Sequence, residues 1–236
     1  GQDGLPTTIR VTHGPMLGRP AANTMSLWMR TERPGPVKVL FGRDKNTFDR
    51  EAVLETTDIT RDNTGILKLD KLQANTRYYY RVEDHQLSGS FLTLPRAVDF
   101  KNAKGNPKGL FNFKFEFACG NNQRGGGDSA GPTLPVFDTL NRQVRDEIHF
   151  AILNGDWLYE DQRAYPASEW LHQVGIDSLG QAPDIVQKAP TVVGVWENYK
   201  IYLERGRNLS EWHRHIPSFY TADDHELLND LSLIHI

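Results

Sequence analysis

The chain has 236 residues, which is long for one ordinary domain and comfortable for two smaller ones. Its formal net charge of -3 and the absence of a Lys/Arg cluster argue against nucleic acid as the main partner. No apolar run approaches the roughly 20 residues of a membrane-spanning helix, so we expect no transmembrane segment. Because Cys119 is the one cysteine, no intramolecular disulfide can form and packing must hold the fold together.

Residues 8–95 have the pattern of short strands separated by turns. Apolar and polar residues alternate over 23–31, and turns rich in Pro, Gly and Asn separate the runs that follow. These β-rich runs are 37–42, 78–83 and 89–95. Regular short strands of this kind predict a β-sandwich, and 72–82 is similar to the late strand of a fibronectin type III module. We therefore expect residues 1–97 to form an N-terminal β-sandwich domain whose tyrosines are core and corner residues.

The sequence pattern changes after this region. Residues 98–111 are polar and rich in Lys, Asn and Gly, which indicates a linker. A strand is predicted at 113–118, a helix at 135–147 and an apolar strand at 148–153. Strand, helix and strand form a βαβ unit, whose two strands should be parallel. We expect residues 112–230 to form an α/β unit.

Three strand ends in this second region carry side chains of the metal-ligand type. Cys119 directly follows the first strand, and Asp156 and Tyr159 follow the second. A third candidate strand, 216–222, is followed by Asp-Asp-His-Glu at 223–226. The carboxyl ends of parallel strands meet at one edge of a sheet. If the three strands share one sheet, these groups converge there.

A thiol, carboxylates, a phenol and an imidazole can together bind metal ions. Oxygen donors suit hard cations, whereas a thiolate suits softer or higher-valent transition metals, so the set predicts two unlike ions. Two ions roughly 3.5–4 Å apart can clamp a phosphate and turn a bound water into hydroxide. On this hypothesis Asp156 bridges the ions, while Cys119 and Tyr159 bind the softer one. Asp224 helps to bind the other ion, and His225 is the catalytic residue that stabilises or protonates the leaving group.

The order of these blocks resembles that of the PhoD-type alkaline phosphatases and phosphodiesterases of the metallophosphoesterase superfamily. Cys119 comes first, Gly-Asp-x-x-Tyr-Glu follows at 155–160, and Asp-Asp-His-Glu follows at 223–226. Either block alone would be a weak signal, but the two in order make a specific match. Most of residues 8–230 fits the layout of the family.

The resemblance implies both a fold and an activity. The family's iron-binding Cys, Asp and Tyr fall on Cys119, Asp156 and Tyr159, and its Asp-His block falls on Asp224 and His225. It implies a four-layer αββα domain, of which this chain would hold the N-terminal portion, and Fe³⁺ and Ca²⁺ as metals. The implied reaction is hydrolysis of phosphate mono- or diesters by in-line attack of a metal-bound hydroxide. The implied substrates include cell-wall polymers and extracellular organic phosphate, in an extracellular, periplasmic or cell-surface setting.

The sequence also departs from the family. Members often carry His where Asn154 stands and an aromatic residue where Ala222 stands, changes that should affect packing more than ligation. The superfamily supplies further ligands after the Asp-His block, whereas this chain stops ten residues after Glu226. We therefore expect a C-terminally truncated fragment that is nearly inactive by itself. Residues 231–236 match one reading frame of a common sequencing adapter, so we expect a non-native tail there.

Alternative interpretations stay open at this point. The chain could be a binding or adhesion module with an inert α/β part and no metal. Asp156 and Glu226 could instead be the carboxylate pair of a glycosidase, which requires a separation of roughly 5–9.5 Å across a sugar cleft. His213 and His215 have the composition of a ligand pair but precede its expected place, which favours packing or surface positions. A lone cysteine such as Cys119 is most often a small buried hydrophobe.

Overall fold

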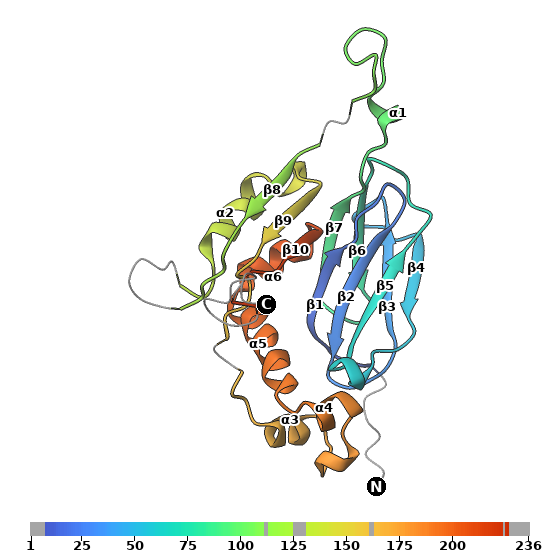
Figure 1. Ribbon diagram of the computed structural model, residues 1–236. Helices are drawn as coiled ribbons and strands as arrows, with labels where there is room; N and C mark the ends of the chain where they lie inside the picture. The colour runs from blue at the N-terminus through green and yellow to red at the C-terminus, as the bar shows by residue number, and fades with distance from the viewer. Residues whose placement is uncertain (1–7, 111–112, 125–130, 161–162, 224, 227–236) are drawn as a thin grey trace.

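The computed structural model describes residues 8–110, 113–124, 131–160, 163–223 and 225–226. Two antiparallel sheets come first along the chain, and a parallel sheet with helices follows (Figure 1). The predicted order of a sandwich and then a parallel α/β unit is therefore confirmed. The expected tail at 231–236 lies outside the described residues.

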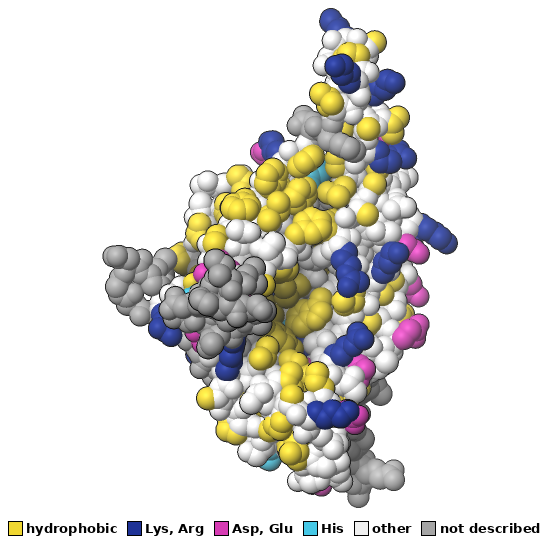
Figure 2. Space-filling view, viewed as in Figure 1, with side chains coloured by type: hydrophobic (Ala, Val, Ile, Leu, Met, Phe, Trp, Pro, Cys, Tyr) yellow, Lys and Arg dark blue, Asp and Glu magenta, His cyan; other side chains and the backbone are white. Residues whose placement is uncertain are grey.

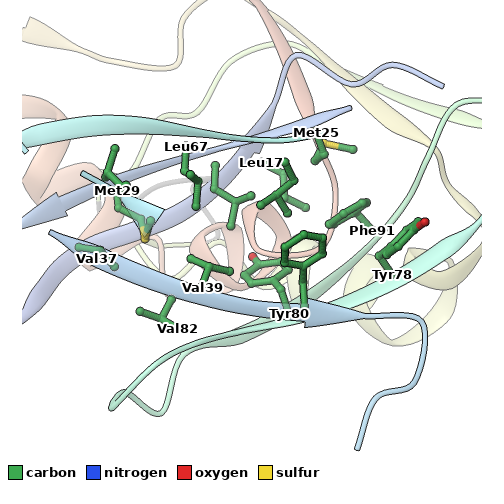
Figure 3. Close-up of a cluster of buried hydrophobic side chains, with 14 of the residues drawn as sticks. Leu17, Met25, Met29, Val37, Val39, Leu67, Tyr78, Tyr80, Val82 and Phe91 are labelled. Carbon is green, nitrogen blue, oxygen red and sulfur yellow. The ribbon is translucent and has the colours of Figure 1, made fainter. Parts of the chain in front are cut away.

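The N-terminal part is a β-sandwich. Its seven strands are β1 (Val11–Gly18), β2 (Met25–Thr31), β3 (Val37–Gly42), β4 (Arg50–Leu54), β5 (Thr64–Leu69), β6 (Arg77–Val82) and β7 (Ser88–Leu92). One sheet has the order β1-β2-β5 and the other the order β4-β3-β6-β7. Apolar side chains from both sheets form one buried core (Figure 3). In β2 the alternating Met25, Leu27 and Met29 are all fully buried, as a strand with one face against the core requires.

The tyrosines of β6 have the structural roles predicted for them. Tyr78 and Tyr80 are both buried, and the ring of Tyr78 stacks on Phe91 with 5.5 Å between centroids. The hydroxyl oxygen of Tyr78 accepts a hydrogen bond of 2.9 Å from the backbone N–H of Gln73. This bond ties the strand to the preceding corner of the chain, as a corner tyrosine does.

The second part is built on three parallel strands. They are β8 (Phe115–Ala118), β9 (Phe150–Asn154) and β10 (Ser218–Thr221), in the spatial order β10-β9-β8. Both pairings are parallel, as the βαβ pattern predicts. The helices are α1 (Ala97–Phe100), α2 (Pro135–Gln143), α3 (Ala167–Gln173), α4 (Asp184–Lys188), α5 (Val192–Arg205) and α6 (Arg207–His213). The segment expected to be a linker thus begins with the short helix α1.

The two faces of the parallel sheet differ in their covering. On one face β9 packs against α2 and α6 through a core that includes Phe137, Leu153 and Trp212. On the other face Phe115, Phe117 and Phe219 are each 43–59% exposed. Figure 2 shows a broad hydrophobic area over the parallel sheet. Parallel sheets are usually covered on both faces. Among the described residues no second sheet lies over these aromatic rings, so the four-layer αββα arrangement stays a prediction.

The sandwich lies against the helical part along a polar and aromatic interface. The Tyr80 hydroxyl donates to the carbonyl of Arg214 at 2.7 Å, and Ser90 Oγ lies 2.9 Å from His215 Nδ1. His213 is 2% exposed, and burial lowers its pKa to about 3. Burial likewise lowers the pKa of His215 to about 4. Both side chains are packing residues, as their position in the sequence indicates. In the part of the chain that the structure describes, the helices are too short or too polar to cross a membrane.

Candidate functional site

The carboxyl ends of β8, β9 and β10 meet at one edge of the sheet, as the parallel arrangement predicts. The N–H of Gly120 donates to the carbonyl of Gly155 at 3.1 Å, and the N–H of Asn121 donates to that of Asp156 at 2.7 Å. The segment after Cys119 therefore runs beside the turn after β9. On the other side of this turn, a Cβ added to Gly155 would lie 2.5 Å from Cβ of Asp223, which follows β10.

The turn after β9 depends on its Gly-Asp sequence. Gly155 and Asp156 have φ values of 80° and 56°, both in the left-handed region. Glycine adopts this region readily, and Asp enters it more often than most other residues do. Asn154, the position where the family often carries His, accepts a hydrogen bond of 2.9 Å from the Thr221 hydroxyl. At this position the side chain links β9 to β10, a packing role.

Both carboxylate oxygens of Glu226 accept hydrogen bonds from the backbone of the same turn. Oε2 accepts from the backbone N–H of Asp156 at 3.0 Å and of Asp223 at 2.7 Å. Oε1 accepts from the N–H of Leu158 at 3.2 Å and from that of Trp157. Partial burial acts to raise the pKa of Glu226, but these four donors outweigh it and lower the pKa below its ordinary value.

This geometry argues against the glycosidase alternative. The acid of such a pair needs a raised pKa so that it can protonate the leaving oxygen. Glu226 has a lowered pKa, and its two oxygens are occupied by backbone donors. Its role is to fix the turn that carries Asp156.

His225 lies in a cluster with two residues of the second block. Its Nδ1 is 2.9 Å from Oε2 of Glu160, and its ring centroid is 4.1 Å from that of Tyr159. A carboxylate at Nδ1 fixes the orientation of the ring. The ring of Tyr159 also lies parallel to that of Tyr202, with 6.5 Å between centroids.

Gly120, the residue directly after Cys119, lies close to this cluster. A Cβ added to Gly120 would be 3.9 Å from the Tyr159 hydroxyl, so the phenol oxygen lies beside the residue that follows Cys119. Cys119 is exposed, unlike the usual lone cysteine. Asp224, the other predicted ligand, lies outside the described residues.

The donor types near this edge are those that the sequence predicts for a metal site. Carboxylate and phenol oxygens suit a hard ion, and a thiol sulfur suits a softer or higher-valent ion. Together these donors suit a pair of unlike ions. Within the described residues, no three His, Cys, Asp or Glu side chains form a group that could hold a metal ion. The ligand set of Cys119, Asp156, Tyr159 and Asp224 therefore stays a prediction.

The structure adds residues that sequence reasoning does not identify. The side-chain amide of Asn198 donates to the carbonyl of Tyr159 at 2.5 Å. The guanidinium of Arg163 donates to the carbonyls of His225 at 2.9 Å and Glu226 at 2.5 Å. Neither residue belongs to a motif, so no local signal in the sequence indicates these roles.

A half-open cavity of about 950 Å³ lies between the sandwich and helix α5, and Figure 2 shows a hollow on this face. Its lining is mostly apolar and includes the rings of Trp28, Tyr199 and Tyr202. Trp157 and Glu226 line the cavity and also belong to the turn at the strand ends. The cavity therefore reaches the candidate site.

Comparison with known proteins supports a fold relationship. A family described as a domain of unknown function, DUF7800, matches residues 8–89. The solved structure of PhoD aligns with a TM-score of 0.63 and 19% identity, covering 92% of this chain and 39% of the PhoD chain. The resemblance to PhoD is thus confirmed at the level of the fold, over a chain that spans 39% of PhoD's length.

Other solved structures match the chain more weakly. The sensor domain of the anti-sigma factor RsgI4 of Pseudobacteroides cellulosolvens aligns with a TM-score of 0.28 and 12% identity, covering 39% of this chain and 100% of that one. A computer-redesigned β-sandwich protein aligns with a TM-score of 0.25 and 25% identity, covering 38% of this chain and 94% of that one. No curated protein sequence matches the chain.

Proposed function

We propose that this sequence forms part of a PhoD-like, metal-dependent phosphohydrolase that cleaves phosphate mono- or diesters. The observation that carries the proposal is the meeting of the segment after Cys119, the Asp156 turn and the Tyr159–His225 pair at one edge of a parallel sheet. The PhoD-like fold over 92% of the chain supports it. Because the chain covers 39% of PhoD, the activity is proposed for the natural protein that contains these residues.

The proposed ligands are Cys119, Asp156, Tyr159 and Asp224, and the proposed ions are Fe³⁺ and Ca²⁺. When bound, the ions would supply the positive charge that activates a water and neutralises the phosphate. Residues of this chain position the proposed ligands without the ions. Glu226 holds the turn of Asp156 through backbone N–H groups, which leaves the position of this turn independent of the ions.

His225 is the proposed proton donor to the leaving oxygen. Its Nδ1 lies 2.9 Å from Glu160, and a carboxylate in this position fixes the orientation of the imidazole. After bond cleavage the proton passes from the imidazolium to the leaving alkoxide, so that the alcohol departs in its neutral form. The arrangement is general acid catalysis with a second residue that orients the acid.

The test is an assay of the natural protein with p-nitrophenyl phosphate and its bis-ester. We expect turnover that EDTA abolishes and that Fe³⁺ and Ca²⁺ restore after the chelator is removed. The 236-residue chain provides the comparison, and its rate should be near the uncatalysed background. A binding module would turn over neither ester, and full activity after exhaustive chelation would contradict the metal-dependent mechanism.

A further inference from the structure

A buried ion-pair network joins the sandwich to the helical part of the chain. Asp62, in the sandwich, is fully buried and accepts hydrogen bonds of 3.2 Å from Nε and Nη2 of Arg30. From the helical part it accepts one bond from Trp170 Nε1 at 3.0 Å and one from the Tyr199 hydroxyl at 2.8 Å. Lys200 Nζ lies 3.5 Å away. One carboxylate thus accepts hydrogen bonds from both parts of the molecule.

The charge of Asp62 is essential to this network. Burial acts to raise the pKa of Asp62, but Arg30 and Lys200 outweigh burial and hold it below the ordinary value. Arg30 and Lys200 are themselves 8% and 4% exposed. Without Asp62 the buried Arg30 would lose its carboxylate partner, which is strongly unfavourable, whereas Lys200 would keep its ion pair with Glu197. The network therefore fixes one position of helix α5 against the sandwich.

Helix α5 also contacts Tyr159. Asn198, directly before Tyr199, is 1% exposed and donates to the carbonyl of Tyr159 at 2.5 Å. Tyr202, one turn further along α5, lies parallel to the Tyr159 ring at an interplanar angle of 10°. A hydrogen bond and a ring contact from α5 therefore set the position of Tyr159.

Helix α5 also supports the His225 side of the site. A Cβ added to Gly194 would lie 2.4 Å from the carbonyl oxygen of Arg163, so the loop backbone approaches the helix as closely as glycine allows. The guanidinium of Arg163 donates to the carbonyls of His225 and Glu226. A shift of α5 would move Tyr159 and Arg163 together.

We propose that Asp62 is a positioning residue for the candidate site and acts through helix α5. The N-terminal sandwich then sets how Tyr159 and His225 face each other, 4.1 Å apart between ring centroids. That this positioning matters for catalysis rests on the proposed function. The contacts that lead from Asp62 through helix α5 to Tyr159 are independent of it. The sandwich is part of the framework of the site rather than a separate module.

The test compares two tyrosine hydroxyls that each make one bond across the same interface. Tyr199→Phe removes the bond of 2.8 Å to Asp62, and the control Tyr80→Phe removes the bond of 2.7 Å to Arg214. The readout is the NMR shift of the His225 ring protons in the metal-free 236-residue chain, which responds to the nearby Tyr159 ring. We expect Tyr199→Phe to move these signals and Tyr80→Phe to leave them in place, although both lower the urea midpoint.

Asp62→Asn should move the His225 signals further in the same direction. If that variant does not fold, Tyr199→Phe together with Lys200→Met decides the question. Unchanged His225 signals in Tyr199→Phe, or an equal change in Tyr80→Phe, would overturn the proposal. No metal, substrate or turnover enters this measurement. A natural protein without phosphoesterase activity would therefore count against the proposed function alone.

Discussion

Asp156→Asn should reduce phosphoester hydrolysis by the natural protein roughly thousandfold, the scale of losing one electrostatic group from a catalytic site. The substitution removes the charge and keeps the backbone groups through which this residue bonds to Glu226 and Asn121. Its N–H donates to Glu226 at 3.0 Å, and its carbonyl accepts from Asn121 at 2.7 Å. Asn also tolerates the φ of 56° found here. The measurement is kcat/KM for the bis-ester at a common metal concentration.

A matched control for Asp156→Asn is available on helix α2. Asp138→Asn makes the same chemical change in an exposed ion pair of 2.9 Å with Arg142. Exposed pairs contribute little to stability, and both partners of this one lie on helix α2. The control should keep its activity. A folded Asp156→Asn protein with the activity of the control would refute the role assigned to Asp156.

Glu226→Ala should destabilise the chain by roughly 3 kcal/mol, because it leaves four backbone N–H groups without their charged acceptor. Three of these donors, those of Asp156, Trp157 and Leu158, belong to the turn after β9, and that of Asp223 follows β10. The loss should therefore separate the ends of the two strands. Urea unfolding of the 236-residue chain measures it. Glu226→Gln, which keeps the size but removes the charge, should lose less.

The same residue should give part of the pH dependence of stability. The folded-state pKa of Glu226 lies below its ordinary value of 4.5, so the unfolded chain binds the proton more readily. Its stabilisation is complete above about pH 4.5 and is lost as the pH falls towards and through the folded-state pKa. The stability difference between the wild type and Glu226→Gln should shrink over this range. A difference that stays constant with pH would show that the charge of Glu226 does not stabilise the turn.

Periodicity and strand order predict the main framework of the molecule. The alternation that contains Met25, Leu27 and Met29 is local, and so is the apolar run that becomes β9. The convergence of the strand ends follows from a general rule, since parallel strands place their carboxyl ends at one edge. These features could be predicted because each depends on neighbouring residues or on topology.

The supports of the site depend instead on contacts between distant parts of the chain. Asp62 meets Tyr199 across 137 positions, and Asn198 meets Tyr159 across 39, with no pattern in the sequence to indicate either pairing. Glu226 could be identified as an acid but not as a backbone acceptor, because three of its four donors come from a turn about 70 residues earlier. Such pairings follow from the packing of helix α5 and the loops, which local sequence does not specify.

The most direct test of the account is the metal content of the natural protein after loading with Fe³⁺ and Ca²⁺ and extensive dialysis. Cys119→Ser, Asp156→Asn and Tyr159→Phe are compared with Asp138→Asn by elemental analysis. We predict bound metal in the wild type and in Asp138→Asn, and reduced content in each of the other three, because these three residues are proposed ligands. Equal metal content in all four variants, or none in the wild type, would contradict the account.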